Sequence, residues 1–474
     1  MIYDIYTPEK VTEKAKVLFK HERAKDRLDG WFIAKEKELR IYDSLAEYDE
    51  EVKKALIIKE IVKDIPIDLD ENQIFAGTQD DSFARSYALI NPSFRVEEFA
   101  GYCDPAAVFG DIVPNEEFTE ERIKKAKDEF LKTEYAKKLK KVYTESESYT
   151  KEVIYFFEQV TGHLIPDFRF ALKHGLKALI NEMKNKEGNG YKAFVIALEA
   201  ACDLAARYEK LAREKAEALP EPQKSQFILM ADTLKKVPFN GAENLYEAIQ
   251  SFIILWQMMC LEQAPNPFAF SVGNADRIFE PYRNGLDRDE TAALFKHFLV
   301  FFNVADRSWA ISQNIIVSGR SVCGEDLTNP TTYALLDAYY DMNLPQPILS
   351  VKLHKNTPEK LYRELGRFFF SPGVLTPSMF NDDALFETLG SHGVDKDDLP
   401  DIAIAGCQEP LIMGEDNANT TNSWFNLPKI LEMTLTGGYS LITGEKLCDA
   451  EKAPLENIRE EFYKNVKFFA HFES

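Results

Sequence analysis

Cysteines are scarce in this sequence, and those present are far apart. No two of them form a Cys-x-x-C pair. This spacing argues against a disulfide framework or a zinc site and favours reduced thiols in the cytoplasm. The N-terminus also lacks an apolar core of signal-peptide length, so we predict a cytoplasmic protein. The six cysteines are Cys103, Cys202, Cys260, Cys323, Cys407 and Cys448.

Basic residues and long apolar runs are also in short supply. The chain has 57 basic and 78 acidic residues, with a formal net charge of -21. This balance argues against nucleic acid or an anionic membrane surface as the main partner. The most apolar run, residues 252–256, is too short to cross a bilayer. With 45% hydrophobic content over 474 residues, we expect a soluble globular protein with about three domains, or one large α/β domain with added helices.

The first half of the chain predicts mainly helices. Thr119 is the expected N-cap of the first long charged helix. The helix predicted at 242–262 is almost entirely apolar, so we expect it to be buried. Composition shifts at about residue 240, which we take as a soft boundary between a helical region, 1–240, and an α/β region, 241–474. The predicted helices cover residues 117–142, 166–187, 192–218 and 242–262.

The second half alternates short β-rich runs with helical segments. This alternation predicts parallel strands joined by crossover helices, with both faces of the sheet covered. The predicted strands are 314–318, 348–353 and 402–404. The predicted helices are 330–342, 357–370 and 383–390.

The segment Gly-Cys-Gln-Glu-Pro at 406–410 is the strongest candidate for chemistry. Gly406 permits unusual backbone angles, and Pro410 favours extended geometry at Glu409. A thiol at Cys407 and a carboxylate at Glu409 would then share one tight, rigid loop. Cys407 is equally compatible with packing as a small apolar residue at a strand end. A carboxylate in such a loop either carries a desolvation cost or serves a function.

The Gly406–Pro410 loop resembles the thiyl-radical loop of the glycyl radical enzymes, the pyruvate formate-lyase-like superfamily. Five further segments resemble that family in the same order along the chain: 161–167, 271–276, 344–351, 377–382 and 425–429. The resemblance implies an α/β fold, an incomplete ten-stranded β/α barrel (the first half-barrel) surrounded by many helices. It also implies a lyase or dehydratase acting on a small polar, hydroxylated molecule.

The resemblance assigns roles to individual residues. Cys407 would abstract hydrogen from the substrate, and Glu409 would be a general base, a role that burial would suit. The radical would be installed on a backbone glycine by a separate radical-SAM activating enzyme, with no cofactor or metal bound in this chain. His163 has two interpretations, as a residue that binds substrate and as a cap of the helix after Pro166. The substrate-binding positions implied are His163, Ser271, Asn381 and Thr421.

Several positions depart from the family pattern. Gly406 stands where pyruvate formate-lyase has the first of two adjacent cysteines, and Thr421 stands where diol dehydratases have an acid. No Arg-Val-x-Gly motif follows Cys407, and Gly437-Gly438-Tyr439 lies too close behind it. We therefore expect a truncated chain, inactive alone, whose radical glycine lies on a missing segment or a second chain. A homodimer is expected by analogy.

Three alternatives remain open from the sequence. The chain is compatible with a non-catalytic or remnant subunit that pairs with a separate chain. Within the family it is also compatible with a C–C lyase, a decarboxylase or a formate acetyltransferase-like enzyme. A thiol-based transferase with Cys407 as nucleophile would need a histidine beside the sulfur, and the sequence places none there.

Overall fold

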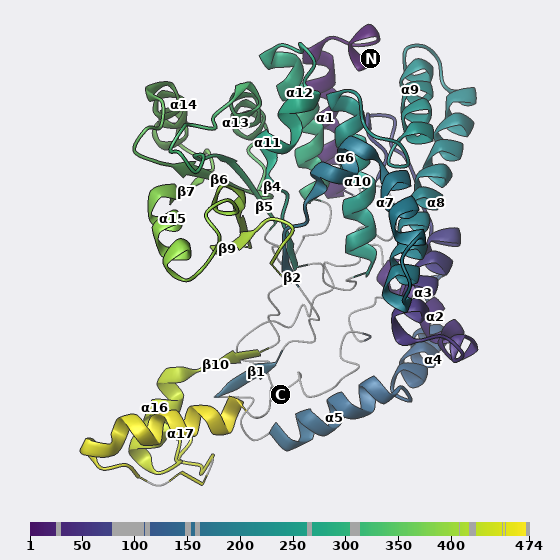
Figure 1. Ribbon diagram of the computed structural model, residues 1–474. Helices are drawn as coiled ribbons and strands as arrows, with labels where there is room; N and C mark the ends of the chain where they lie inside the picture. The colour runs from purple at the N-terminus through teal and green to yellow at the C-terminus, as the bar shows by residue number, and fades with distance from the viewer. Residues whose placement is uncertain are drawn as a thin grey trace. The chain divides into compact units, whose positions relative to one another are not determined.

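The computed structural model divides into two compact units, which we describe separately (Figure 1). Unit 1 comprises Met1–Ala88 and Gly162–Asn419, and unit 2 comprises Leu89–Thr161 and Thr420–Ser474. No helix in the part of the chain described is long and apolar enough to span a membrane. The structure describes residues 1–24, 30–77, 109, 114–146, 153–156, 162–262, 268–303, 313–406, 408–416, 423–447, 449–450 and 452–470.

Unit 1 is mostly helical. The 30-residue helix α8 (Asn189–Ala218) packs against α3 and α9, as the right-hand side of Figure 1 shows. Small and apolar side chains at helical spacing, such as Ala201, Leu204 and Ala205, bury one face of α8, as predicted for 192–218. The other helices of the unit are α1 (Pro8–Ala24), α2 (Gly30–Ile41), α3 (Glu50–Asp64), α6 (Phe168–His174), α7 (Leu176–Lys184), α9 (Gln223–Lys236), α10 (Leu245–Glu262), α11 (Ala275–Phe279), α12 (Arg288–Val300), α13 (Pro330–Met342), α14 (Glu359–Phe370) and α15 (Asp382–Ser391).

The prediction of one helix over 166–187 was wrong, because the chain breaks at Gly175 between α6 and α7. Gly175 has φ 73°, a left-handed conformation that favours glycine. A Cβ at this position would lie 2.4 Å from the carbonyl oxygen of Phe239. The neighbouring backbone therefore requires a glycine, and the helix restarts at Leu176 in a new direction.

The apolar helix predicted at 242–262 is confirmed as α10, although it begins at Leu245. Its Phe252 ring contacts Phe168 at 4.4 Å and Phe298 at 5.2 Å between ring centroids. Trp256 lies against Phe302 at 5.3 Å. These buried rings form an aromatic core between α10 and α12, where each ring removes a large apolar area from water.

Four parallel strands form the largest sheet, in the order β4 (Gly273–Asn274), β5 (Asn314–Ser318), β6 (Ile348–Leu353) and β7 (Ser378–Asn381). The predicted strands 314–318 and 348–353 match β5 and β6, and α13 and α14 are the crossover helices. Every residue of β5 is buried, as expected for a strand covered on both faces, whereas β7 is partly exposed.

A second parallel pair, β2 (Gly162–Leu164) with β3 (Phe268–Phe270), joins this sheet through two residues. The Ser271 N–H donates to the Leu164 carbonyl at 3.0 Å, and the Val272 N–H donates to the Asn314 carbonyl at 2.9 Å. The extended segment is interrupted between β3 and β4, because Gly273 has φ 86°. Among the described residues the sheets remain small, with two or four strands, and the predicted first half of a ten-stranded barrel is not confirmed.

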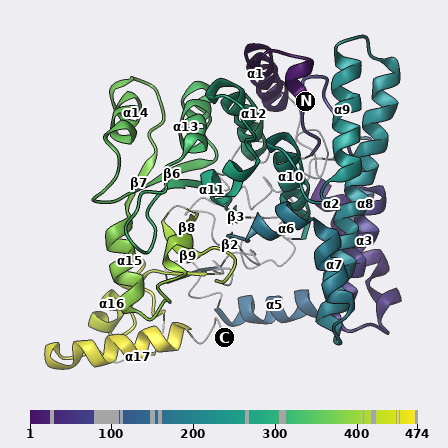
Figure 2. The ribbon, with the colours of Figure 1, turned by 45° about the horizontal axis from the view of Figure 1, so that its top comes forward.

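The third predicted strand, 402–404, does not join the parallel sheet. It is β8 (Ile402–Ala405), which pairs antiparallel with β9 (Glu409–Ile412) in a hairpin (Figure 2). The expectation that it continues the parallel pattern was therefore wrong. β8 is fully buried and packs against β4 and β5. The hairpin therefore contacts the parallel sheet without adding a strand to it.

Unit 2 contains α4 (Glu120–Phe130), α5 (Glu134–Ser146), α16 (Leu427–Thr436) and α17 (Ile458–Ala470). It also contains the antiparallel pair β1 (Ile154–Phe156) and β10 (Ser423–Phe425). The Thr119 hydroxyl accepts from the Arg122 N–H at 3.3 Å, so the predicted N-cap is confirmed. The single helix predicted over 117–142 was wrong, because the Thr133 hydroxyl accepts from the Ala136 N–H at 3.2 Å and caps a second helix.

Candidate active site

The turn of the β8–β9 hairpin lies in unit 1 beside strand β2. Gly406 opens this turn with φ 58°. A Cβ at position 406 would lie 2.4 Å from Nε2 of His163 and 2.7 Å from Oε2 of Glu409. Glycine is therefore required here by backbone conformation and by space, which confirms the role predicted for it. Cys407, the next residue, lies outside the described residues.

His163 and Glu409 face each other across Gly406. The distance between His163 Nε2 and Glu409 Oε1 is 3.7 Å. Burial lowers the pKa of His163, and the negative charge of Glu409 opposes that shift. The imidazole is therefore held neutral at pH 7. A buried neutral imidazole beside a carboxylate can exchange protons with a hydroxyl group placed between or beside them.

Glu409 is less enclosed than predicted. Its side chain is 39% exposed, so the prediction that the Glu409 carboxylate is buried was wrong. The carboxylate is still oriented, because its Oε2 accepts a hydrogen bond from the Gln408 N–H at 3.0 Å. Pairing of Glu409 with Ala405 across the hairpin fixes its backbone as well.

The alternative interpretation of His163, as a helix cap, is wrong. The N-cap of α6 is Asp167, whose side chain accepts from the Arg169 N–H at 2.9 Å. His163 instead lies in β2 with φ 55°, a left-handed angle that is unusual for a residue other than glycine. Uncommon backbone angles of this kind cluster at functional sites.

Ser271 lies behind the hairpin turn, in a buried polar network. Its Oγ accepts from the Asn314 N–H at 3.0 Å. The Asn314 amide donates to the Ser350 Oγ at 2.9 Å and to the Gly406 carbonyl at 3.2 Å. One predicted substrate-binding residue is therefore connected to the turn through the side chain of Asn314.

Asn381 and Thr421 are not brought to this network. Asn381 ends β7 and caps α15, where its side chain accepts from the Ala384 N–H at 3.2 Å. The contacts among described residues do not join Asn381 to His163 or Glu409. Thr421 lies outside the described residues. Substrate binding by His163, Ser271, Asn381 and Thr421 stays a prediction.

The base of the hairpin is held by residues that the sequence analysis did not select. The buried Lys352 amine donates to the carbonyls of Ile402 at 2.8 Å and Pro400 at 3.3 Å. Asn274 donates to the Ile402 carbonyl at 3.4 Å, and Arg277 donates to the Pro400 carbonyl at 2.5 Å. Polar residues at alternate positions of apolar strand runs, such as Ser350 and Lys352 in β6, are the signal that could have indicated this anchoring.

Burial lowers the pKa of Lys352 to about 8. The positive charge of Arg277 contributes to this lowering of the pKa, whereas the negative charges of Asp382, Asp276 and Asp401 oppose it. These groups form a charged cluster around the buried amine, and burial brings the pKa of this lysine much closer to neutral pH than that of an ordinary lysine.

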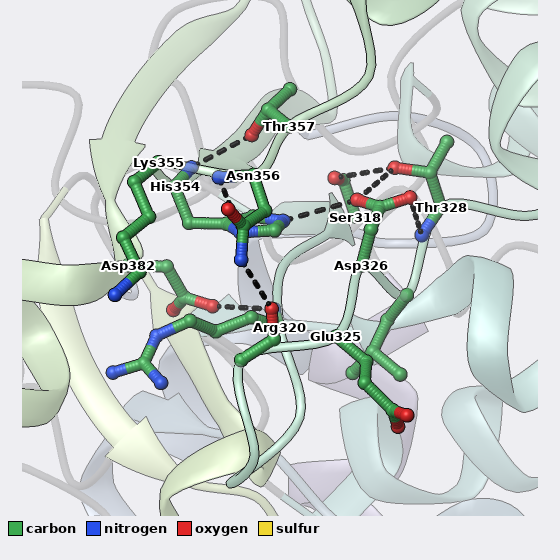
Figure 3. Close-up of polar contacts among 12 residues, drawn as sticks. Ser318, Arg320, Glu325, Asp326, Thr328, His354, Lys355, Asn356, Thr357 and Asp382 are labelled. Atoms are coloured by element: carbon green, nitrogen blue, oxygen red, sulfur yellow. Dashed lines mark hydrogen bonds and ion pairs between the residues drawn. The ribbon is translucent and has the colours of Figure 1, made fainter.

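A neighbouring polar cluster is saturated with internal contacts (Figure 3). The His354 Nε2 lies 3.0 Å from Asp326 Oδ1, and its Nδ1 accepts from the Asn356 N–H at 3.3 Å. The Thr328 hydroxyl donates to the same Asp326 oxygen at 2.9 Å. Both ring nitrogens are occupied, so we interpret this cluster as structural. No three His, Cys, Asp or Glu side chains within the described ranges are grouped as metal ligands.

A family model described as Pyruvate formate lyase-like matches residues 9–473. The chain is 28% identical over 333 residues to the trans-4-hydroxy-L-proline dehydratase of Clostridioides difficile, which covers 64% of this chain and 41% of that protein. It is similar in structure to the glycerol-bound B12-independent glycerol dehydratase of Clostridium butyricum, with a TM-score of 0.78, 20% identity, and coverage of 97% of this chain and 62% of the other. A glycyl radical enzyme from Archaeoglobus fulgidus gives a TM-score of 0.74, 21% identity and coverage of 98% and 63%.

The chain therefore spans about two fifths of its curated relative and less than two thirds of the solved structures. The structural likeness confirms a helix-rich α/β fold similar to that of these enzymes. The match of the family model covers nearly every position of the sequence, including the hairpin and both residues of the His163–Glu409 pair. The chain belongs to the pyruvate formate lyase-like family.

Proposed function

We propose that this chain carries the hydrogen-abstracting loop of a glycyl radical lyase or dehydratase acting on a small hydroxylated molecule. The observation that carries the proposal is the pairing of His163 with Glu409 at 3.7 Å across Gly406, beside Cys407. The names of two similar proteins, a hydroxyproline dehydratase and a glycerol dehydratase, support a hydroxylated substrate.

The proposed reaction is a redox-neutral loss of water. A backbone glycyl radical supplied from outside the described residues takes the hydrogen atom of the Cys407 thiol. The sulfur then takes a hydrogen atom from the substrate carbon next to the one that bears the leaving hydroxyl, and Glu409 takes a proton from the hydroxyl or amine group on the carbon that lost the hydrogen. The adjacent C–O bond breaks, and the leaving hydroxide receives the proton from Glu409 and departs as water. The product radical takes a hydrogen atom back from the thiol.

We assign the substrate hydroxyl to His163, whose neutral imidazole can donate or accept a hydrogen bond. The parallel strands would form the first half of a ten-stranded barrel. They are β2, which precedes residue 241, and, within the region 241–474, β3 with β4, β5, β6 and β7. Such an enclosure would exclude water from the reactive intermediates. The other proposed substrate-binding residues are Ser271, Asn381 and Thr421.

The proposed partners are a radical-SAM activating enzyme and the segment that bears the radical glycine, on a longer form of this protein or on a second chain. Exposed apolar side chains support such a partner: Met379 of the edge strand β7 is 52% exposed, and Phe370 at the end of α14 is 87% exposed. We also propose a homodimer working in an anaerobic cytoplasm.

The test is to co-express the chain with the activating enzyme and a polypeptide carrying the glycine motif, without air. We expect a glycyl radical signal by electron paramagnetic resonance and turnover of glycerol or trans-4-hydroxy-L-proline. Cys407→Ser should keep the signal and abolish turnover. Turnover that survives Cys407→Ser would refute the proposal. A signal with neither substrate turned over would favour the non-catalytic subunit, or the carbon–carbon lyase and decarboxylase alternatives.

One observation favours a second candidate function. The structure places the His163 imidazole beside the Gly406 turn, although no local sequence pattern indicated a histidine near Cys407. A thiol nucleophile activated by that histidine is the arrangement that a thiol transferase needs. This candidate predicts activity in air and rapid alkylation of Cys407 without the activating enzyme.

A further inference from the structure

The side chain of Asn314 ties the turn of the β8–β9 hairpin to the parallel sheet. Asn314 is the first residue of β5 and is completely buried. Its amide nitrogen donates to the Gly406 carbonyl at 3.2 Å and to Ser350 Oγ at 2.9 Å. A carbonyl oxygen can only accept, so the chemistry fixes which end of the amide faces Gly406. The orientation of the Asn314 side chain is therefore determined.

Asn314 is itself immobilised through its backbone. Its N–H donates to Ser271 Oγ at 3.0 Å, and its carbonyl accepts from the Val272 N–H at 2.9 Å. The residue also pairs with Ile348 in the β5–β6 register. An amide fixed at this many points is a rigid support for whatever it binds.

The hairpin itself does not provide that support at its turn. The last cross-strand pair is Ala405 with Glu409, so the register leaves residues 406–408 outside the ladder. Gly406 begins the turn, and glycine is the residue type with the widest range of allowed backbone angles. The Gly406 carbonyl belongs to the planar peptide unit that contains the nitrogen and Cα of residue 407. Holding its oxygen therefore fixes the orientation of that peptide plane at the start of the turn.

We propose that Asn314 is a positioning residue, which holds the Gly406 carbonyl and thereby sets the place of the turn and of Glu409 relative to His163. Its catalytic importance rests on the function proposed above. A second observation supports a positional role: the Asn314 Oδ1 is buried and has no hydrogen-bond partner among the described residues. An unpaired buried acceptor costs stability, so stability alone does not favour asparagine here.

The test compares three variants of the chain by amide hydrogen exchange and by alkylation of cysteines with iodoacetamide, both read by mass spectrometry. Asn314→Asp is isosteric but cannot donate to Gly406 when ionised, and Asn314→Ala removes the side chain without a charge. Ser350→Ala removes the other acceptor and leaves the Gly406 bond. Cys260 and Cys323 serve as internal references, and α8 reports on the global fold.

We expect Asn314→Ala to raise exchange in residues 402–412 and alkylation of Cys407 by about 10-fold, the scale of one buried hydrogen bond. Ser350→Ala should change either rate by less than about 3-fold, with α8 and the reference cysteines unaffected. Unchanged rates in the hairpin would overturn the proposal. A rise in α8 equal to that in the hairpin would also overturn it, because Asn314 would then serve the fold in general. Asn314→Asp repeats the test if Asn314→Ala does not fold.

Activity measurements distinguish failure of the proposed function from failure of the positioning role of Asn314. In the assembled enzyme, Asn314→Ala should keep the glycyl radical signal and lower kcat with little change in KM. If the unmodified enzyme shows neither signal nor turnover, the proposed function fails while the exchange and alkylation results stand. If the enzyme turns over and Asn314→Ala has the same kcat, the positioning role fails alone.

Discussion

The imidazole of His163 occupies the space that any side chain at Gly406 would need: a Cβ there would lie 2.4 Å from its Nε2. The two residues come from β2 and the β8–β9 turn, which are remote in sequence. The hairpin can approach β2 this closely only because residue 406 has no side chain.

Gly406→Ala should destabilise the protein by at least about 2 kcal/mol, from left-handed backbone strain plus overlap with His163. Urea unfolding measures this loss. Gly373→Ala is the matched control, because Gly373 has φ 80° but no atom within 4 Å of where its Cβ would lie, so it carries the strain alone. Equal losses in the two variants would contradict the close contact.

Glu409→Gln should lower kcat of the assembled enzyme by about 10²- to 10⁴-fold, because the amide cannot accept the substrate proton. Steady-state kinetics with glycerol measures the change. Glu415→Gln removes the same charge from an exposed residue just beyond the hairpin and should leave kcat unchanged. Comparable activity of Glu409→Gln and the unmodified enzyme would remove Glu409 from the mechanism.

Lys352 should make stability rise with pH. Its pKa is about 8 in the folded protein and 10.5 in the unfolded chain, so between these values the unfolded state binds more protons and the free energy of unfolding increases. The full gain is about 3 kcal/mol. Lys352→Met should abolish that rise in urea unfolding between pH 7.5 and 10.5. The exposed Lys355→Met should preserve it, and an unchanged slope in Lys352→Met would contradict the assignment.

His297 should make the protein sensitive to acid. Burial lowers the pKa of His297 to about 3, from 6.5, and its Nε2 donates to the Val11 carbonyl at 2.9 Å. Below pH 6.5 the unfolded chain gains a proton that the folded protein does not bind, so stability falls by about 2 kcal/mol between pH 6.5 and 4.5.

His297→Gln keeps a donor for Val11 but cannot titrate, so its acid loss should be smaller by that amount in urea unfolding. The exposed His174→Gln should behave like the unmodified protein. A His297→Gln variant as acid-sensitive as the unmodified protein would show that another group controls the acid limb.

Local patterns were sufficient to predict much of the α/β region. The strand at 314–318 and the helix at 330–342 match β5 and α13 residue for residue. The helix has a local start signal, since Asn329 accepts from the Thr332 N–H at 3.2 Å and Pro330 follows it. Where hydrophobic period and capping residues agree, the sequence is enough.

The remainder depends on contacts between distant segments. The run at 402–404 has the composition of a buried parallel strand, and nothing local says that it pairs with the residues after its own turn. The break at Gly175 follows from the backbone of Phe239, and the environment of Glu409 follows from His163. Sequence reasoning selected Gly406, Glu409 and His163 but not Asn314 or Lys352, whose side chains bind the carbonyls of Gly406 and Ile402.

The hairpin enters and leaves on the same side, anchored at one end by Lys352 and at the other by Asn314. A strand advances about 3.3 Å per residue, so adding one residue to each arm would carry the Gly406 carbonyl out of reach of the Asn314 amide. Insertions and deletions in the two arms are therefore ruled out unless the sheet residues that hold the hairpin change with them.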